Sequence, residues 1–260
     1  MITTVLLDLD DTILQDSPAT LIAFRAVAEH AASVAGVNPE ELIGSVRSHS
    51  DQLWEAGPFP GWLDAIGTGP REGLRARFEG EDPHWATMRE WGPTFRYQSW
   101  MTALESLGVG DTGLAAELDA MFERERAQAN PWCSGAEEAL KQLAANYRLG
   151  MVTNGIPDVQ RTKIDNTGLD RYFDAIVISG ELAIGKPEPA IYQHALGLLD
   201  AKPEETIMVG DSFPRDVLGS QSFGMRGVWI SMGRPQPDVG DPWLTIKSLA
   251  ELPSHLDNLT

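Results

Sequence analysis

The sequence predicts an α/β fold in which a mostly parallel sheet is covered by helices on both faces. Three observations predict it: a short apolar run opens the chain, residues 16–128 have a purely helical pattern, and apolar runs alternate with helical stretches from residue 129 onward. Continuous apolar strands alternating with helices are typical of buried parallel sheets. We therefore expect a Rossmann-like three-layer α/β/α core with an inserted all-α domain.

The first strand is predicted over residues 3–7, which are apolar and end at acidic residues. Helices are expected next: one after Ser17-Pro18 with an apolar stripe, and one opened by Asn38 as N-cap with Pro39 behind it. Residues 57–70 are rich in Gly and Pro, which predicts a loop. Further helices are predicted over about residues 93–107 and around residues 114–122.

The pattern changes after residue 128. Ser134 and Glu137 have the spacing of a capping box, and a later helix is predicted to open at Pro187. Apolar runs predict strands over residues 150–152, 175–178, 206–209 and 227–230. Because the first strand lies far upstream, we expect residues 1–15 and 129–260 to form the core and residues 16–128 the inserted domain.

The composition excludes several classes of protein. With 20 Lys and Arg against 38 Asp and Glu, the net charge of −18 disfavours nucleic acids and anionic membranes as partners. The single cysteine, Cys133, excludes an internal disulfide and a cysteine-based zinc site. The N-terminus lacks a basic signal-peptide region, and no apolar run approaches the ~18 residues of a membrane span. These features predict a cytoplasmic protein.

Four polar sites follow predicted strands, and ligands of open parallel sheets bind beyond the carboxyl ends of the strands. The first site is Asp8-Leu9-Asp10-Asp11-Thr12. In an extended segment Asp8 and Asp10 point to the same side, where two carboxylates repel unless a cation intervenes. With a hard cation, one carboxylate can serve as ligand and nucleophile while its neighbour transfers protons. The alternative is an Asp-rich turn that caps a helix.

The second and third sites are suited to an anion. Thr153-Asn154-Gly155 precedes a helix start, where backbone N–H groups and the helix dipole attract negative charge. Lys186, between Gly185 and Pro187, would neutralise charge on a transferring phosphoryl group. Taken alone, the first of these is also typical of a helix cap, and the second of a solvated surface lysine.

The fourth site combines two carboxylates. Asp211 directly follows an apolar strand, where a carboxylate needs a partner, and a divalent cation shared with Asp8 would supply one. Asp216 lies five residues later and would orient Lys186 or a metal-bound water. A helix cap is again the alternative.

Together, in this order, the four sites resemble the four motifs of the haloacid dehalogenase-like (HAD) hydrolase superfamily. The resemblance is strongest over roughly residues 1–15 and 129–232. The insertion after the first motif resembles the α-helical cap of the branch that contains N-acylneuraminate-9-phosphatase, phosphoglycolate phosphatase and a group of 5′-nucleotidases.

This resemblance implies a Mg²⁺-dependent phosphohydrolase that acts on a small phosphorylated metabolite through an aspartyl-phosphate. Asp8 would be the nucleophile and Asp10 the general acid and base. The ion would be held by Asp8, the backbone carbonyl of Asp10, and Asp211. Thr153 and Asn154 would bind phosphate oxygens, Lys186 would balance charge, and Thr12 would help to fix the first loop.

Other functions stay open at this point. The carbon–halogen hydrolases of the superfamily generally lack the second aspartate of the first motif and need no metal, so Asp10 and Asp211 favour a phosphatase over a 2-haloacid dehalogenase. A phosphomutase uses the same core chemistry, and a catalytically silent phospho-ligand-binding module is the non-enzyme alternative. The sequence does not distinguish a monomer from a homodimer.

The insertion is rich in tryptophan and arginine, with Trp54, Trp62, Trp85, Trp91 and Trp100 among its residues. These side chains suit an aromatic and cationic lid over the substrate. The interpretation we favour is that the tryptophans pack a small helical domain and the arginines solvate it.

Overall fold

The computed structural model describes residues 1–258, and across them one sheet of six strands is formed, all parallel. The strand order is β3-β2-β1-β4-β5-β6. In chain order the strands are β1 (Thr4–Leu7), β2 (Arg148–Thr153), β3 (Ala175–Ile178), β4 (Thr206–Gly210), β5 (Arg226–Ile230) and β6 (Leu244–Ile246). The predicted α/β fold class is thereby confirmed.

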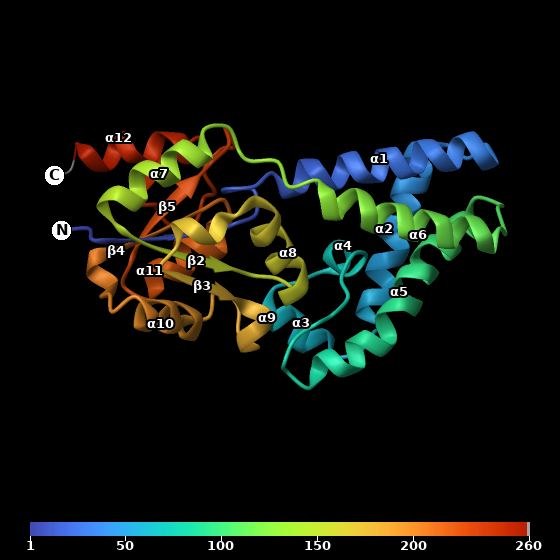
Figure 1. The fold of residues 1–260 in the computed structure, drawn as a ribbon, viewed down its shortest axis with the longest axis horizontal. Helices are drawn as coiled ribbons and strands as arrows, with labels where there is room; N and C mark the ends of the chain where they lie inside the picture. The colour runs from blue at the N-terminus through green and yellow to red at the C-terminus, as the bar shows by residue number, and fades with distance from the viewer. Residues whose placement is uncertain (259–260) are drawn as a thin grey trace. The chain divides into compact units, whose positions relative to one another are not determined.

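Helices cover both faces of this sheet (Figure 1). α7 (Ala136–Asn146) and α12 (Leu252–Asp257) lie on one side, and α10 (Pro189–Leu198) and α11 (Gly219–Ser222) on the other. Apolar side chains of α10 form a core cluster with β1, β2, β3 and β4. All four residues of β1 and all five of β4 are buried, which is why both strands read as continuous apolar runs.

The sheet order brings the carboxyl ends of β1 and β4 together. Leu7 pairs with Met151 of β2 on one side and with Val209 of β4 on the other. The backbone N–H of Asp8 extends this ladder by donating to the carbonyl of Val209 at 2.9 Å. Residues that follow β1 and β4 therefore lie at the same edge of the sheet, although about two hundred residues separate them in the chain.

The chain divides into two compact units. The sheet unit comprises Met1–Asp16, Pro131–Asn154 and the chain from Thr167 onward, and the helical unit comprises Ser17–Asn130 and Gly155–Asn166. The division into core and inserted domain stays a prediction. The two compact units differ from the predicted core and inserted domain mainly in one segment, Gly155–Asn166, which belongs to the helical unit.

Two carboxylates, one buried and one partly buried, tie this segment into the helical unit. Asp158, in α8 (Pro157–Thr167), accepts hydrogen bonds from the backbone N–H groups of Arg77 at 2.8 Å and Glu79 at 3.0 Å. In return, Glu72 accepts one from the backbone N–H of Ile156 at 2.6 Å. These bonds satisfy backbone groups in loops and at a helix start, where no intrahelical partner exists.

The other elements of the helical unit are α-helices. They are α1 (Asp16–Ala35), α2 (Pro39–Glu55), α3 (Pro60–Ile66), α4 (Pro70–Gly73), α5 (His84–Ser106) and α6 (Thr112–Gln128). Their core is aromatic: Trp54, Trp85 and Trp100 are buried, and the rings of Phe24 and Phe122 pack 4.5 Å apart. The tryptophans thus pack the helical unit, as the favoured interpretation had it.

The predicted cap of α2 is confirmed, because the Asn38 side chain accepts from the backbone N–H groups of Glu40 and Glu41 at 2.9 and 3.2 Å. Two predictions for this unit are wrong. Residues 57–70 are not only loop but contain α3, whose Leu63 and Ile66 are buried in the core. α5 begins at His84 and continues through Pro93, because burial of Trp85 and Met88 outweighs the missing hydrogen bond at the proline.

Two predicted helix starts in the sheet unit are also corrected. Ser134 does not cap α7, because Gly135 at φ 71° occupies the N-cap position and the serine lies one residue too early. α10 begins at Pro189 rather than at Pro187. Pro187 instead lies in the turn that precedes the helix, where the Lys186–Pro187 peptide bond is cis.

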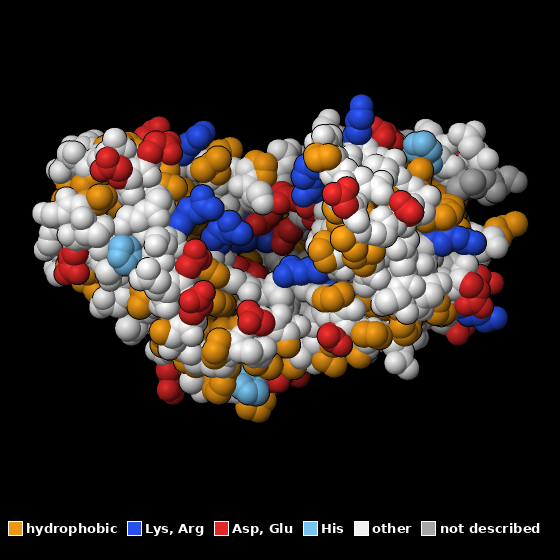
Figure 2. Space-filling view, turned by 180° about the vertical axis from the view of Figure 1, so that it is seen from behind, with side chains coloured by type: hydrophobic (Ala, Val, Ile, Leu, Met, Phe, Trp, Pro, Cys, Tyr) orange, Lys and Arg blue, Asp and Glu red, His pale blue; other side chains and the backbone are white. Residues whose placement is uncertain are grey.

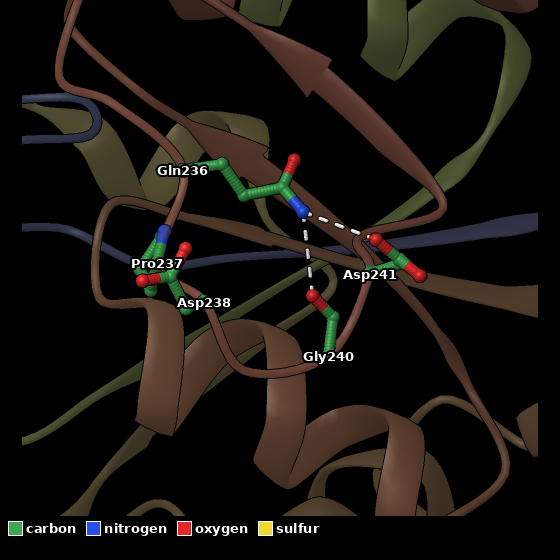
Figure 3. Close-up of a pocket in the computed structure, with 5 residues that line it drawn as sticks. All are labelled: Gln236, Pro237, Asp238, Gly240 and Asp241. Carbon is green, nitrogen blue, oxygen red and sulfur yellow. Dashed lines mark hydrogen bonds between the residues drawn. The ribbon is translucent and has the colours of Figure 1, made fainter.

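None of the helices described is both long and apolar enough to cross a membrane. Acidic and basic side chains are both scattered over the face drawn in Figure 2. A surface hollow of about 410 Å³ lies in the loop before β6 (Figure 3), where the Gln236 amide donates to the Asp241 carboxylate at 3.1 Å. Among the described residues, none of the predicted site residues lines this hollow.

Candidate active site

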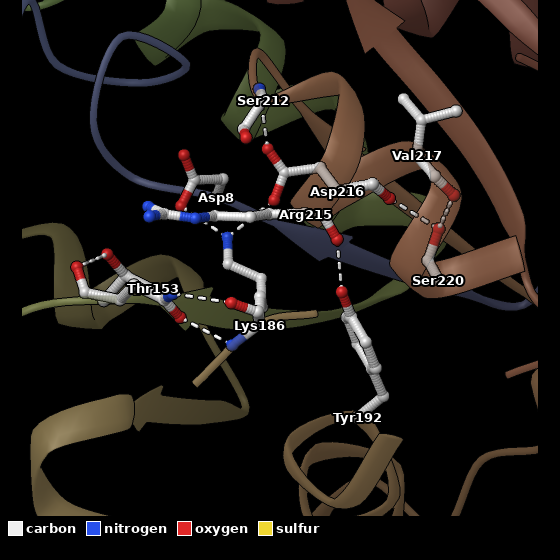
Figure 4. Close-up of polar contacts among 10 residues, drawn as sticks. Asp8, Thr153, Lys186, Tyr192, Ser212, Arg215, Asp216, Val217 and Ser220 are labelled. Atoms are coloured by element: carbon white, nitrogen blue, oxygen red, sulfur yellow. Dashed lines mark hydrogen bonds and ion pairs between the residues drawn. The ribbon is translucent and has the colours of Figure 1, made fainter. Parts of the chain in front are cut away.

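A buried lysine joins two of the predicted carboxylates. The Lys186 ammonium donates to Asp8 Oδ1 and to Asp216 Oδ1, at 2.7 Å in each case (Figure 4). The Lys186 and Asp216 side chains are 2% and 0% exposed, so both ion pairs are shielded from water. Three residues from three of the four predicted sites therefore meet in one network at the carboxyl edge of the sheet.

Asp211 lies at the same place. One carboxylate oxygen of each of Asp8, Asp211 and Asp216 lies within 4.8 Å of the others. Arg234 contacts Asp211 as well, donating to its carboxylate at 3.3 Å and to its backbone oxygen at 2.9 Å. The expected proximity of Asp8 and Asp211 is thus present in the structure.

The carboxylates of this cluster are not fully neutralised by the nearby cations. Burial raises the pKa of Asp8 to about 8; Lys186 opposes this rise, while Asp216 and Asp211 add to it. Burial and the neighbouring Asp216 and Asp11 raise the pKa of Asp211 to about 6. Burial lowers the pKa of Lys186, but Asp216 and Asp8 together raise it above its usual value. The lysine of the site is therefore protonated, and an additional positive charge would further stabilise the ionised carboxylates.

The second predicted site contacts the third through the backbone. The Asn154 amide accepts from the Lys186 N–H at 2.8 Å and donates to the Lys186 carbonyl at 2.9 Å. Thr153 ends β2 and is buried next to Asn154. Asn154 thus positions the backbone of Lys186, whereas phosphate binding by Thr153 and Asn154 stays a prediction.

Asp10 and Thr12 lie in the loop that follows β1. The backbone of Asp10 forms an isolated β-bridge with Leu14, and Leu14 forms another with Trp132. These two β-bridges fix the loop against the chain that precedes α7. Thr12 is 1% exposed, and its hydroxyl has no hydrogen-bond partner among the described residues. The catalytic role of Asp10 and the supporting role of Thr12 stay predictions.

Sequence reasoning missed three contributors to the site. The backbone N–H of Ser212 donates to Asp216 Oδ2 at 2.9 Å, Arg234 contacts Asp211, and the Tyr192 hydroxyl donates to the backbone oxygen of Arg215. Only Tyr192 carried a signal: it lies in the apolar stretch of α10, and a buried tyrosine needs a partner for its hydroxyl.

The cluster fits a hard divalent cation. Its donors are carboxylate oxygens, the type of ligand that Mg²⁺ prefers, and they lie close enough to share one ion. The raised pKa values of Asp8 and Asp211 have the same physical origin, because burial and mutual repulsion disfavour several negative charges in one place. A bound cation removes that repulsion.

The chain is similar to known proteins over most of its length. The family model of haloacid dehalogenase-like hydrolases matches residues 2–224. A phosphoserine phosphatase of Thermus thermophilus is 38% identical, covering 95% of this chain and 96% of that protein. The N-acylneuraminate-9-phosphatase of Rattus norvegicus is 32% identical, over 63% of this chain and 68% of that protein.

Solved structures agree on the fold. A 2-haloacid dehalogenase from Pseudomonas syringae pv. Tomato DC3000 has a TM-score of 0.64 and 25% identity, with 100% of both chains covered. The sequence relatives confirm the prediction of a hydrolase of the phosphatase type. The chain belongs to the haloacid dehalogenase-like hydrolase family, as the order of its four motifs indicated.

Proposed function

We propose that this protein is a Mg²⁺-dependent phosphatase that hydrolyses a small phosphorylated metabolite through an aspartyl-phosphate on Asp8. The observation that carries the proposal is the bridge from Lys186 to both Asp8 and Asp216, with the Asp211 carboxylate beside them. A lysine held between buried carboxylates stays charged, and a charged lysine beside Asp8 attracts a phosphate group.

The metal would be held by the carboxylates of Asp8 and Asp211 and by the backbone carbonyl of Asp10. When bound, it would offset the negative charge of the carboxylates and of the phosphate oxygens. Asp216 is already engaged by Lys186 and by the Ser212 N–H, so its part is to orient Lys186.

The side chains divide the reaction between them. An Asp8 carboxylate oxygen attacks phosphorus, and the bond between phosphorus and the leaving oxygen breaks as Asp10 gives that oxygen a proton. Asp10 then takes a proton from water, which attacks phosphorus and releases Asp8 and inorganic phosphate. Lys186 balances charge on the phosphoryl oxygens throughout, and Thr153 with backbone N–H groups binds them.

The first substrate to test is phosphoserine, because the relative that matches 95% of this chain is a phosphoserine phosphatase. A panel of phosphorylated sugars, nucleotides and small acids, with p-nitrophenyl phosphate as a generic substrate, tests the wider class. We expect released phosphate with Mg²⁺, loss of release with a chelator, and loss of at least about a thousandfold in Asp8→Asn. Asp51→Asn, an exposed carboxylate on α2, is the matched control and retains activity.

Each alternative has its own outcome in this experiment. Wild-type activity in Asp8→Asn would remove the nucleophile assignment. Chelator-insensitive halide release from a 2-haloacid would instead favour a dehalogenase, the activity named for the structural relative from Pseudomonas syringae. An isomeric phosphate as product would indicate a mutase, and tight binding without turnover across the panel would indicate a binding module.

A further inference from the structure

The turn that carries Asp216 is held by side-chain hydroxyls at three successive carbonyls. This turn, η3 (Phe213–Leu218), is π-helical. The Tyr192 hydroxyl donates to the carbonyl of Arg215, and the Ser220 hydroxyl donates to the carbonyls of Asp216 at 2.5 Å and Val217 at 3.0 Å (Figure 4). π-helical turns are rare and frequently occur at functional sites.

The surroundings of the turn leave little freedom to move. A Cβ atom at Gly210 would lie 2.2 Å from Asp216 Oδ2, and one at Gly219 would lie 2.6 Å from the Tyr192 hydroxyl. A Cβ atom at Gly227 would lie 2.8 Å from the Cα of Val217. Glycines at these three positions thus allow β4, β5 and the Tyr192 side chain of α10 to approach the turn closely.

Tyr192 closes a ring of contacts between the third and fourth motifs. It lies on α10, which begins three residues after Lys186, and its hydroxyl reaches the residue just before Asp216. Asp216 in turn accepts from Lys186, which donates also to Asp8. Tyr192 is 0% exposed, and burial together with Asp216 and Asp8 raises its pKa, so its hydroxyl remains a donor.

We propose that Tyr192 is a positioning residue of the reaction, which locks the π-helical turn so that Asp216 holds Lys186 against Asp8. The proposal rests on the proposed function, because it assigns the effect of Tyr192 to the geometry of the same site. Without the hydroxyl, the carbonyl of Arg215 loses this side-chain donor and the turn is held less firmly, whereas the ring of Tyr192 still packs beside Phe223.

Tyr192→Phe tests this, because it removes one oxygen and keeps the buried ring. We expect kcat for p-nitrophenyl phosphate with Mg²⁺ to fall by about 10- to 100-fold with KM changed less than about twofold, since a small misplacement of charged groups slows the chemical step. Amide hydrogen exchange, measured without metal or substrate, is expected to become faster in residues 213–220. Tyr172→Phe is the matched control: it removes a hydroxyl that donates to Glu137 of α7 in the same unit and keeps the ring, and neither readout changes.

A second variant keeps the test decisive if Tyr192→Phe folds poorly. Ser220→Ala removes the hydroxyl that holds the carbonyls of Asp216 and Val217, and it is expected to give the same fall in kcat with faster exchange in residues 213–220. Wild-type kcat in a folded Tyr192→Phe or Ser220→Ala protein, or a fall in kcat without faster exchange, would overturn the proposal. Absence of phosphatase activity in the wild type contradicts the proposed function instead, and the exchange measurement still reports on the turn.

Discussion

Each unit of the molecule buries carboxylates, but the two units satisfy them differently. In the helical unit, Asp158 accepts hydrogen bonds from two backbone N–H groups, and among the described residues of this unit no three acidic side chains gather within 4.8 Å of one another. In the sheet unit, Asp8, Asp211 and Asp216 lie within 4.8 Å of one another around Lys186. The first arrangement holds two chain segments together, whereas the second retains a repulsion that a divalent cation would relieve. Crowding of carboxylates, rather than burial alone, therefore distinguishes the candidate active site.

The largest effect is expected from removing the Lys186 ammonium, which pairs with both Asp8 and Asp216. Lys186→Met leaves Asp8 and Asp216 buried without it, so we expect phosphatase activity to fall by about a thousandfold and the free energy of unfolding to fall by about 3–5 kcal/mol. Denaturant unfolding and phosphate release measure the two effects. Lys141→Met, which removes only surface ion pairs with Glu137 and Glu138, is the control and changes little. A Lys186→Met protein as stable as the wild type would contradict this account.

Magnesium is expected to stabilise the sheet unit by relieving the same repulsion. At a Mg²⁺ concentration of about 100 times the dissociation constant, the free energy of unfolding rises by about 2.7 kcal/mol, which appears as a higher melting temperature. Asp211→Asn removes one proposed ligand and is expected to abolish the rise, whereas Asp158→Asn retains it. An equal rise in wild type and Asp211→Asn would exclude Asp211 as a ligand.

The Asp158 carboxylate of the helical unit is expected to contribute to stability and not to catalysis. Asp158→Ala leaves the backbone N–H groups of Arg77 and Glu79 without their acceptor, and the free energy of unfolding falls by about 1–3 kcal/mol. Well below the melting temperature, kcat is expected to stay at the wild-type value. A large loss of kcat in this variant would break the distinction between the two units.

A further effect on stability is a pH dependence that comes from Glu72. Burial, opposed by Lys163, raises the pKa of Glu72 to about 7 from an ordinary value of 4.5. Between these values the unfolded chain loses the proton first, so rising pH favours unfolding over that range and has no further effect through this group above about pH 7. Glu72→Gln keeps an oxygen acceptor for the Ile156 N–H and carries no charge.

Melting temperatures measured from pH 4.5 to 8 test this expectation. The variant should gain stability relative to the wild type as the pH rises, by an amount that levels off near pH 7. Glu79→Gln, an exposed carboxylate of the same unit, serves as the reference. If Glu72→Gln and Glu79→Gln show the same pH profile, Glu72 does not titrate as the structure indicates.

Local sequence signals predicted the fold class because five of the six strands described contain a short apolar run. The sixth, β6, was not predicted, since it has only three residues and a burial pattern that is partly exposed. β1 and β4 are buried along their whole length, so no charged residue interrupts them before Asp8 and Asp211. The Asn38 cap was equally local, since its side chain bonds the backbone two and three residues later. Predictions failed where packing outweighed local preference, as at Pro93 inside α5 and in the Gly- and Pro-rich segment that contains α3.

The sequence by itself determined the parallel α/β core and the residue types of the site, because strand periodicity and the residues that follow each strand are properties of short segments. Only the tertiary structure decided that Lys186 donates to both Asp8 and Asp216. The same is true of the hydrogen bonds from the Lys186 N–H to Asn154 and from the Tyr192 hydroxyl to the Arg215 carbonyl. These contacts join residues 23 to 178 positions apart, and their geometry follows from strand order and helix packing, which short segments do not specify.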